Sequence, residues 1–232
     1  MAPLSRNSRT VARNQGFTLM TGIFITLEGG EGSGKSSQIR RLKAFLSEQF
    51  PEREVIVTRE PGGTIEAEKI RDLLVNGQAD KFTPQTEALL MVASRTEHVD
   101  KVIRPGLARS AIILCDRFSD SSVVYQGLAQ NIDRNAIDAL HKFAIDGLKP
   151  HRTYLLDLPP ETGLERANKR AGETSLQESR FEDKGLGFHQ RVRSGFLALA
   201  EAEPDRFLKI DALQPEDTVF TIIKSDMLRI IS

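Results

Sequence analysis

A three-layer α/β fold, in which a five-stranded parallel sheet is flanked by helices, is the fold class that this sequence predicts. Five short apolar runs suit strands buried on both faces, because they are rich in β-branched and aromatic residues. They lie at residues 23–28, 54–58, 111–115, 153–158 and 207–210. Longer stretches with helical spacing alternate with them, which is typical of a parallel sheet covered on both faces. The length of 232 residues suits a single domain.

Seven stretches between and after these strands are predicted helices. They cover residues 35–49, 65–75, 84–104, 134–147, 160–171, 187–202 and 215–230. The third begins at Pro84, because proline is tolerated in the first turn of a helix, and Pro105 should end or bend it. Residues 172–186 are polar and weakly periodic, so we expect a mobile surface segment there.

Residues 1–19 differ in composition from the rest of the chain. They contain three arginines, no acidic residue and no apolar run long enough for a signal peptide or a membrane span. We expect a disordered tail before a domain at residues 20–232, and translation from upstream of a true start at Met20 would account for such a tail. An organelle transit peptide is the alternative, although no clear amphipathic stripe supports it.

The overall charge and the cysteine content exclude several classes of protein. Lysine plus arginine and aspartate plus glutamate each number 32, so no basic field favours nucleic acid. We expect no nucleic-acid or membrane partner. The single cysteine, Cys115, excludes an internal disulfide framework and fits a reducing cytoplasm.

The strongest motif runs from Gly29 to Ser36 and matches GxxxxGK(S/T), the loop that wraps the phosphates of a nucleoside triphosphate. It lies between a predicted strand and a predicted helix, as its mechanism requires. Glycines let the backbone N–H groups point inward and form an anion site. Lys35 would bind the β- and γ-phosphates, and the Ser36 hydroxyl would bind Mg²⁺. A glycine-rich turn without a ligand is the alternative.

Three predicted strands end in polar residues that should meet at one edge of the sheet. The first ends at Glu28, the second leads into Thr58–Gly63, and the third ends at Asp116–Phe118. In an open parallel sheet the ligand crevice lies beyond these carboxyl ends. Two arginines and two acids therefore converge beside the triphosphate loop, which predicts a site for a second phosphate-bearing molecule.

The third predicted helix adds a possible base platform. Met91 and Arg95 are four residues apart and share a face with Glu87 and His98. A planar base with a phosphate would suit an apolar side chain beside a cation. In the alternative interpretation, Met91 belongs to the core and Arg95 is a solvated charge.

In combination, these motifs resemble the thymidylate kinases, bacterial-type nucleoside monophosphate kinases of the P-loop NTPase fold. The resemblance covers nearly all of the chain after residue 23 and includes the Arg95 region. Its other motifs are EGGEGSGKSS at 28–37, TREPGGT at 58–64, DRF at 116–118 and SSVVYQG at 121–127. It implies transfer of the γ-phosphate of ATP to dTMP, giving dTDP and ADP for dTTP synthesis. It also implies a Mg²⁺ cofactor, a homodimer and a short lid at about residues 171–187.

The resemblance implies a role for each matching residue. Glu31 approaches the 3′-hydroxyl of dTMP, and Tyr125 packs against the sugar and disfavours ribose. Asp116 helps to hold magnesium through water or orients the attacking phosphate, and Ser36 binds the metal. The 5′-phosphate is gripped by Arg59, Arg95 and Arg117. The base and its surroundings contact Met91, Ser121, Ser122 and Gln126. ATP is bound by Gly29, Gly30, Glu31, Gly32, Ser33, Gly34, Lys35, Ser36, Ser37 and Arg166. The catalytic residues are Lys35, Asp116, Arg117 and Arg170. A structural ion pair is the alternative role for Asp116 and Arg117.

The chain departs from the family pattern at Met91, where the family usually has phenylalanine stacked on thymine. A thioether gives less planar overlap and a more adaptable pocket. The selectivity for thymine is therefore less firmly predicted than the phosphate chemistry.

The loop itself carries no arginine or lysine at residues 30–33, so an extra cation for the transferred phosphoryl group must come from elsewhere. The lid region offers Arg166, Lys169, Arg170 and Arg180. Arg170 aligns best with family members whose lid carries the catalytic arginine. A charged, solvated helix face is the alternative.

Two other functions share part of the pattern. A kinase for another nucleoside monophosphate would have the loop and lid, but it would not predict Glu31, Tyr125 and TREPGG together. A nucleotide switch or partitioning ATPase is less consistent with the sequence. Asn168-Lys169 is followed two positions later by Ala171 instead of a guanine-reading aspartate, and no lysine opens the glycine loop.

Overall fold

One parallel sheet forms the centre of the protein. The computed structural model describes residues 22–173 and 180–231, so the expectation for residues 1–19 lies outside it. The strands are β1 (Ile23–Glu28), β2 (Val55–Arg59), β3 (Ile112–Asp116), β4 (Arg152–Asp157) and β5 (Phe207–Asp211). Every neighbouring pair is parallel, and the strand order is β2-β3-β1-β4-β5. The predicted fold class is confirmed.

Each predicted helix is present, and apart from the third, the helix ends lie within two residues of the prediction. The α-helices are α1 (Lys35–Gln49), α2 (Ile65–Val75), α3 (Pro84–His98), α4 (Arg104–Ala108), α5 (Ser119–Ser122), α6 (Arg134–Ile145), α7 (Pro160–Glu173), α8 (Leu186–Ala202) and α9 (Glu216–Ile231). Two π-helical segments, η1 (Val99–Ile103) and η2 (Val123–Leu128), and one 3₁₀ turn, η3 (Glu182–Lys184), complete the described elements. The sequence did not predict α5, η2 or η3.

The third predicted helix differs from expectation because Pro105 does not stop it. The chain passes from α3 through the wider turn η1 into α4, which contains Pro105. Proline lacks an N–H and its ring collides with the preceding turn of an α-helix, and a π-helical turn can relieve both problems. The helical path therefore continues to Ala108 instead of ending at 104.

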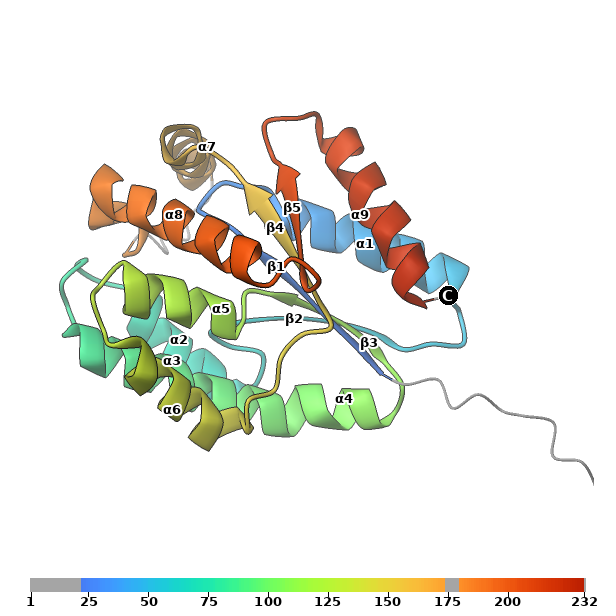
Figure 1. Ribbon diagram of the computed structural model, residues 1–232, viewed down its shortest axis with the longest axis horizontal. Helices are drawn as coiled ribbons and strands as arrows, with labels where there is room; N and C mark the ends of the chain where they lie inside the picture. Colours follow the sequence, from blue (N-terminus) through green and yellow to red (C-terminus); the bar gives the residue numbers. More distant parts are fainter. Residues whose placement is uncertain (1–21, 174–179, 232) are drawn as a thin grey trace, which may run out of the picture.

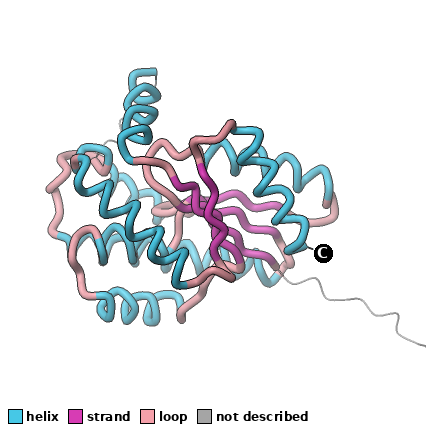
Figure 2. The backbone as a smooth tube through the Cα atoms, turned by 45° about the horizontal axis from the view of Figure 1, so that its top comes forward, coloured by secondary structure: helices cyan, strands magenta, loops and turns pink. Residues whose placement is uncertain are grey.

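The sheet lies between two helical layers, as Figures 1 and 2 show. On one face, α1 and α9 bury Leu42 and Ile223 against β1 residues such as Ile25. On the other face, Phe24 and Ile113 pack under η1, and Leu155 packs under α8 and η2. Both faces of the central strands are thus buried, which explains their continuous apolar runs.

The predicted surface segment at 172–186 is partly corrected by the structure. Helix α7 continues to Glu173, and η3 and the start of α8 occupy its end. Arg180 is fully buried, so this part of the segment is not a solvated surface. Residues 174–179 of the predicted lid lie outside the described residues. Within the described ranges, no helix is both long and apolar enough to cross a membrane.

Candidate active site

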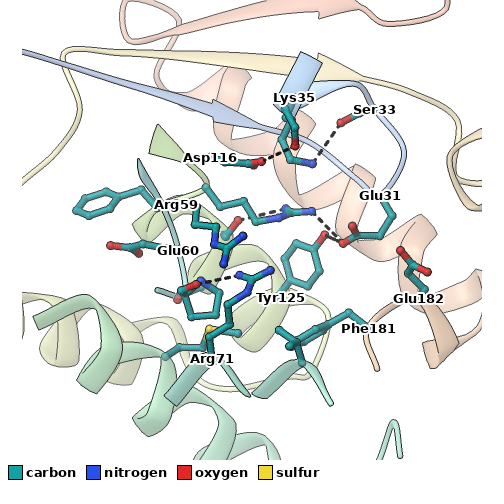
Figure 3. A pocket seen from close by; sticks show the side chains of 18 of the residues that line it. Glu31, Ser33, Lys35, Arg59, Glu60, Arg71, Asp116, Tyr125, Phe181 and Glu182 are labelled. Carbon is teal, nitrogen blue, oxygen red and sulfur yellow. Dashed lines mark hydrogen bonds and ion pairs between the residues drawn. The ribbon is translucent and has the colours of Figure 1, made fainter. Parts of the chain in front are cut away.

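A cavity of about 660 Å³ opens at the carboxyl ends of the strands, where the sequence predicted a ligand crevice. Figure 3 shows Lys35 and Asp116 on one side of it and Arg71 and Phe181 on the other. The cavity is lined by Glu31, Gly32, Ser33, Gly34, Lys35, Ser36, Ser37, Arg40, Arg59, Glu60, Pro61, Arg71, Val75, Met91, Arg95, Asp116, Arg117, Phe118, Ser121, Ser122, Tyr125, Gln126, Ala167, Phe181 and Glu182. Its volume lies within the usual range for small-molecule sites.

The glycine loop joins β1 to α1 and leaves the first turn of α1 open to a ligand. Gly34 has φ of +92° and provides no side-chain cap, so the N–H groups of this turn remain available to an anion. A Cβ on Gly32 would lie 2.1 Å from the carbonyl oxygen of Gly163 in α7, and only glycine fits there. Lys35 donates to the carbonyl oxygens of Gly29 and Gly30 at 3.2 and 3.0 Å.

Ser36 and Asp116 meet beside the loop. The Ser36 hydroxyl donates to Asp116 Oδ2 at 3.1 Å. The other carboxylate oxygen of Asp116 is buried and has no hydrogen-bond partner among the described residues. A buried oxygen of this kind suits a cation, because an unpaired acceptor away from water is costly. Two hard oxygen donors of this type fit Mg²⁺, which takes few protein ligands and shares the phosphates of its nucleotide.

Glu31, Arg117 and Tyr125 form a cluster between the loop and the opposite wall, in which Figure 3 shows the Tyr125 side chain pointing toward Glu31. Glu31 Oε1 accepts from Arg117 Nη2 at 2.9 Å and from the Tyr125 hydroxyl at 3.1 Å. Burial would raise the pKa of Glu31, but Arg117 and then Lys35 lower it to about 2. The carboxylate is therefore ionised at neutral pH. These residues lie 86 and 94 positions apart from Glu31 in the sequence, and the fold brings them together.

A buried glutamate holds the turn that presents Arg117. Arg117 itself adopts φ of +68°, which is strained for a residue with a side chain. Glu28, at the end of β1, accepts from the Phe118 backbone N–H at 2.8 Å and from the Ser121 hydroxyl at 2.7 Å. Burial and the neighbouring Asp120 carboxylate raise the pKa of Glu28 from 4.5 to about 7. The sequence assigned no role to Glu28.

The segment after β2 combines one exposed arginine with one buried acid. Arg59 is half exposed, and its Nη2 lies 3.0 Å from Glu68 Oε2. Glu60 is buried and accepts from Arg95 Nε at 2.6 Å, while its other oxygen meets His98 Nδ1 at 2.9 Å. Glu60 thus fastens the TREPGGT segment to α3.

Arg95 lies in the cavity wall and is only 2 % exposed, so the alternative of a solvated charge is wrong. Besides Glu60, its guanidinium contacts the Ser122 hydroxyl and His141 at 3.0 Å and the Phe118 carbonyl at 3.1 Å. One Nη2 hydrogen has no partner among the described residues. Met91, one turn earlier, is partly exposed and lines the cavity, as predicted for a residue that faces the base.

Arg71, Phe181 and Glu182 also line the cavity, and the sequence did not predict them. Arg71 donates to the Pro61 carbonyl at 2.9 Å. Arg71 lies four residues after Ala67 and three before Leu74, which are both buried in α2. This helical spacing could have predicted that Arg71 lies on the inner face of the helix. No local pattern identifies Phe181 and Glu182, because the chain beyond α7 brings them back to the cavity.

The structure separates the predicted lid cations. Arg166 Nη1 donates to the Ala212 carbonyl at 3.3 Å, beyond β5. Arg180 pairs with Glu87 in a buried contact of 2.6 Å, so its charge is already paired within the protein. The side chain of Arg170 lies outside the described residues. The lining of the cavity does not include Gly29, Gly30 or Arg166.

Comparisons with known proteins agree with this geometry. A family model described as thymidylate kinase matches residues 27–223. The chain belongs to the thymidylate kinase family. It is 52 % identical over 202 residues to a thymidylate kinase of Caulobacter vibrioides, covering 87 % of this chain and 94 % of that protein. A thymidylate kinase of Desulfosudis oleivorans is 46 % identical over 195 residues, with 83 % and 90 % covered.

A crystal structure of the Ehrlichia chaffeensis thymidylate kinase superposes with a TM-score of 0.72 at 32 % identity, covering 89 % of this chain and 99 % of that one. Membership of the family confirms the predicted activity, ATP-dependent phosphorylation of dTMP by a nucleoside monophosphate kinase.

Proposed function

We propose that ATP and dTMP bind end to end in the one cavity, and that the γ-phosphoryl group passes directly to the acceptor phosphate without a covalent enzyme intermediate. The observation that carries this proposal is the contact of Glu31, in the glycine loop, with Arg117 and Tyr125 in the opposite wall. No general base is needed, because a monophosphate is largely ionised near neutral pH. Positioning and charge neutralisation supply the catalysis.

The donor half holds ATP by its backbone N–H groups and by Lys35. In this proposal Lys35 leaves the carbonyls of Gly29 and Gly30 for the β- and γ-phosphates, where it neutralises developing charge. The remaining donor residues are Glu31, Gly32, Ser33, Gly34, Ser36 and Ser37, with Arg166 toward the nucleoside.

Ser36 and Asp116 are the proposed magnesium ligands, directly or through water. Their oxygens, including the unpartnered Asp116 Oδ1, fit this cation. A Mg²⁺ ion held by these residues would supply positive charge against the nucleotide phosphates. Asp116→Asn should weaken the binding of Mg²⁺, measured as a higher Mg²⁺ concentration for half-maximal rate. Unchanged magnesium dependence would contradict this role.

The acceptor half places the phosphate of dTMP near Arg59 and Arg117 and its sugar near Glu31 and Tyr125. Guanidinium groups bind phosphate with paired, charge-assisted hydrogen bonds. Arg95 also belongs to the proposed acceptor site. The second N–H of its Nη2 would donate to the phosphate of dTMP. The base would lie beside Met91, with Ser121, Ser122 and Gln126 around its edges.

The proposed experiment on the acceptor half compares thymidine, deoxyuridine and uridine monophosphates in an ADP-release assay. We expect the order dTMP, dUMP, UMP, because the thymine methyl group would bury apolar surface beside Met91 and because Tyr125 lies against the proposed sugar position. Equal kcat/KM values for dUMP and UMP would show that Tyr125 does not select against ribose. Stoichiometric ATP hydrolysis without phosphorylation of any acceptor would favour the switch or partitioning ATPase instead.

Arg170 is our proposed source of the lid cation. Arg180 is buried against Glu87, and Arg166 contacts the Ala212 carbonyl, which leaves Arg170 and Lys169 at the end of α7. Arg170→Ala should lower kcat by about 10³- to 10⁵-fold, the range for an arginine acting on the transferred group. The KM for dTMP should change little, and Lys169→Ala is the matched control. A kcat near that of the wild type would exclude Arg170.

We also propose that residues 20–232 act as one catalytic domain, with a lid at about 171–187, and that two copies form a homodimer. Phe143 on α6 is 90 % exposed, and Leu89 on the adjoining α3 is 56 % exposed. Exposed large apolar side chains on adjoining helices favour a protein contact. Phe143→Asp should give a monomer by sedimentation, whereas Leu213→Asp, also on an exposed leucine, should not. We place the enzyme in the cytoplasm, since its one cysteine fits a reducing compartment.

A further inference from the structure

Glu87 is a fully buried carboxylate on α3 that the chemistry described above does not use. Its Oε1 accepts from Gln126 Nε2 at 2.8 Å and from Gln130 Nε2 at 2.5 Å. Its Oε2 accepts from Arg180 Nη2 at 2.6 Å and lies 3.4 Å from Lys184 Nζ. Burial would raise the pKa of Glu87, but these four donors keep it below its ordinary value. The group is therefore an ionised acceptor at neutral pH.

An ionised carboxylate fixes which end of the Gln126 amide faces the cavity. A side-chain amide has a donor end and an acceptor end, whereas a carboxylate can only accept. Glu87 therefore bonds the NH₂ end of Gln126, and the carbonyl end is left for the cavity that this residue lines. Gln126 Oε1 has no hydrogen-bond partner among the described residues. The cavity is thus presented with an acceptor at this position.

The same carboxylate also holds the described part of the predicted lid segment, at residues 180–182. Arg180 pairs with Glu87 and donates to the carbonyls of Leu74 at 2.9 Å and Gln78 at 3.2 Å. The next two residues, Phe181 and Glu182, lie in the cavity wall (Figure 3). The Phe181 ring meets Tyr125 edge to face, with 6.0 Å between ring centres. Glu87 therefore anchors two separate parts of the acceptor wall.

We propose that Glu87 is a positioning residue for acceptor specificity, which presents the Gln126 carbonyl to the acceptor base and holds Phe181 and Glu182 in place through Arg180. The proposal rests on the proposed contact of Gln126 with the base. Thymine and uracil carry an N3–H that can donate to this carbonyl. Cytosine has a lone pair at N3, so two acceptors would face each other and leave both unpaired.

The test compares kcat/KM for dTMP and for dCMP in the double variant Glu87→Gln/Arg180→Met. Removing both members of the fully buried pair leaves only Lys184, which is partly exposed, without its carboxylate, so this variant should fold. The amide introduced by Glu87→Gln can donate as well as accept. The Gln126 amide can then rotate by 180° and present its NH₂ end to the cavity. The preference for dTMP should fall about 5- to 150-fold, since an unpaired buried polar group costs about 1–3 kcal/mol.

Two matched variants separate the two anchors. Gln130→Ala removes a Glu87 partner that does not line the cavity, so the preference for dTMP should be unchanged. Arg180→Met keeps the hydrogen bond between Gln126 and Glu87 but releases Phe181 and Glu182. The KM for both acceptors should therefore rise, while the preference for dTMP over dCMP is unchanged. Glu87→Asp keeps the charge but withdraws the carboxylate by one carbon. Glu87→Asp should also lower the preference for dTMP over dCMP, and it provides this test if the double variant does not fold.

Gln126→Ala distinguishes failure of this inference from failure of the proposed base contact. If Gln126→Ala lowers the preference for dTMP but the folded Glu87 variants do not, Glu87 is not a positioning residue and the base contact stands. If Gln126→Ala leaves the preference unchanged, the base contact fails and the role of Glu87 fails with it. Circular dichroism and the thermal unfolding midpoint establish which variants are folded.

Discussion

The two halves of the cavity that we propose for the donor and the acceptor are built in opposite ways. The donor half is a single loop of eight consecutive residues, Gly29–Ser36, whose function lies mainly in backbone N–H groups. The acceptor half takes its side chains from β2, α2, α3, the turn after β3, α5, η2 and residues 181–182. A backbone site requires only the right local conformation, whereas a side-chain site requires that distant elements be held in register.

The supports of the two halves differ in the same way. The glycine loop rests on backbone, with Gly32 directly against Gly163. In the acceptor half, buried carboxylates hold the functional groups: Glu60 binds Arg95, Glu28 holds the turn of Arg117, and Glu87 binds Gln126. Such polar networks rigidify a site when every member is paired. The acceptor half should therefore depend more on residues that never touch substrate.

Among the described residues that line the cavity, the largest effect is expected at Lys35, in the donor half. Lys35→Ala should lower kcat by about 10²- to 10³-fold, because it removes a donor aimed at developing charge. Steady-state assays with Lys43→Ala, an exposed lysine on the same helix, provide the control. A kcat for Lys35→Ala near that of the wild type would show that the loop backbone alone suffices.

Glu28 links the two halves, and its protonation should affect stability. Its pKa is raised from 4.5 to about 7 in the folded protein, so the folded state keeps a proton that the unfolded chain releases. Protonated Glu28 therefore stabilises the folded protein below pH 4.5, and this stabilisation is lost as the pH rises to 7. The free energy of unfolding should fall by up to about 3 kcal/mol over this range. Denaturant unfolding across this range should show Glu28→Gln losing less stability than the wild type. Parallel curves for the two proteins would contradict the shifted pKa.

Arg117 tests whether the acceptor half needs geometry as well as charge. Arg117→Lys keeps the charge but loses the forked donors that reach Glu31 and that we propose for the acceptor phosphate. We expect kcat/KM for dTMP to fall roughly 10- to 100-fold, as for the loss of one charged hydrogen bond. Arg109→Lys, in an exposed ion pair with Glu54, is the control for the same exchange. Full activity of Arg117→Lys would mean that charge alone is sufficient.

The smallest effect is expected at Met91. Met91→Phe should leave kcat high and lower the KM for dTMP by roughly 2- to 10-fold, since an aromatic pair contributes about 0.5–1.5 kcal/mol beyond its buried area. Acceptor titrations at saturating ATP measure this change. A large loss of activity would mean that Met91 does not face the base.

The elements of the fold were predictable because their signals are local. The apolar runs of the strands and the spacing of apolar residues in α1 and α2 placed these elements correctly. The helical path through Pro105 was not predictable, because the adaptation of η1 depends on packing of Val99 and Ile103 against the sheet. The burial of Arg180 was missed for the same reason, since its partner Glu87 is 93 positions away.

The sequence by itself determined the parallel fold, the glycine loop and the arginines at the strand ends, because each depends on neighbouring residues and on the common direction of parallel strands. Only the tertiary structure decided which charges are paired and which face the cavity. It buried Arg95 and Arg180, aimed Arg117 at Glu31, and turned Gln126 toward the cavity. The physical reason is that an ion's partner and its burial depend on residues brought together by folding, and these leave no periodic pattern in the chain.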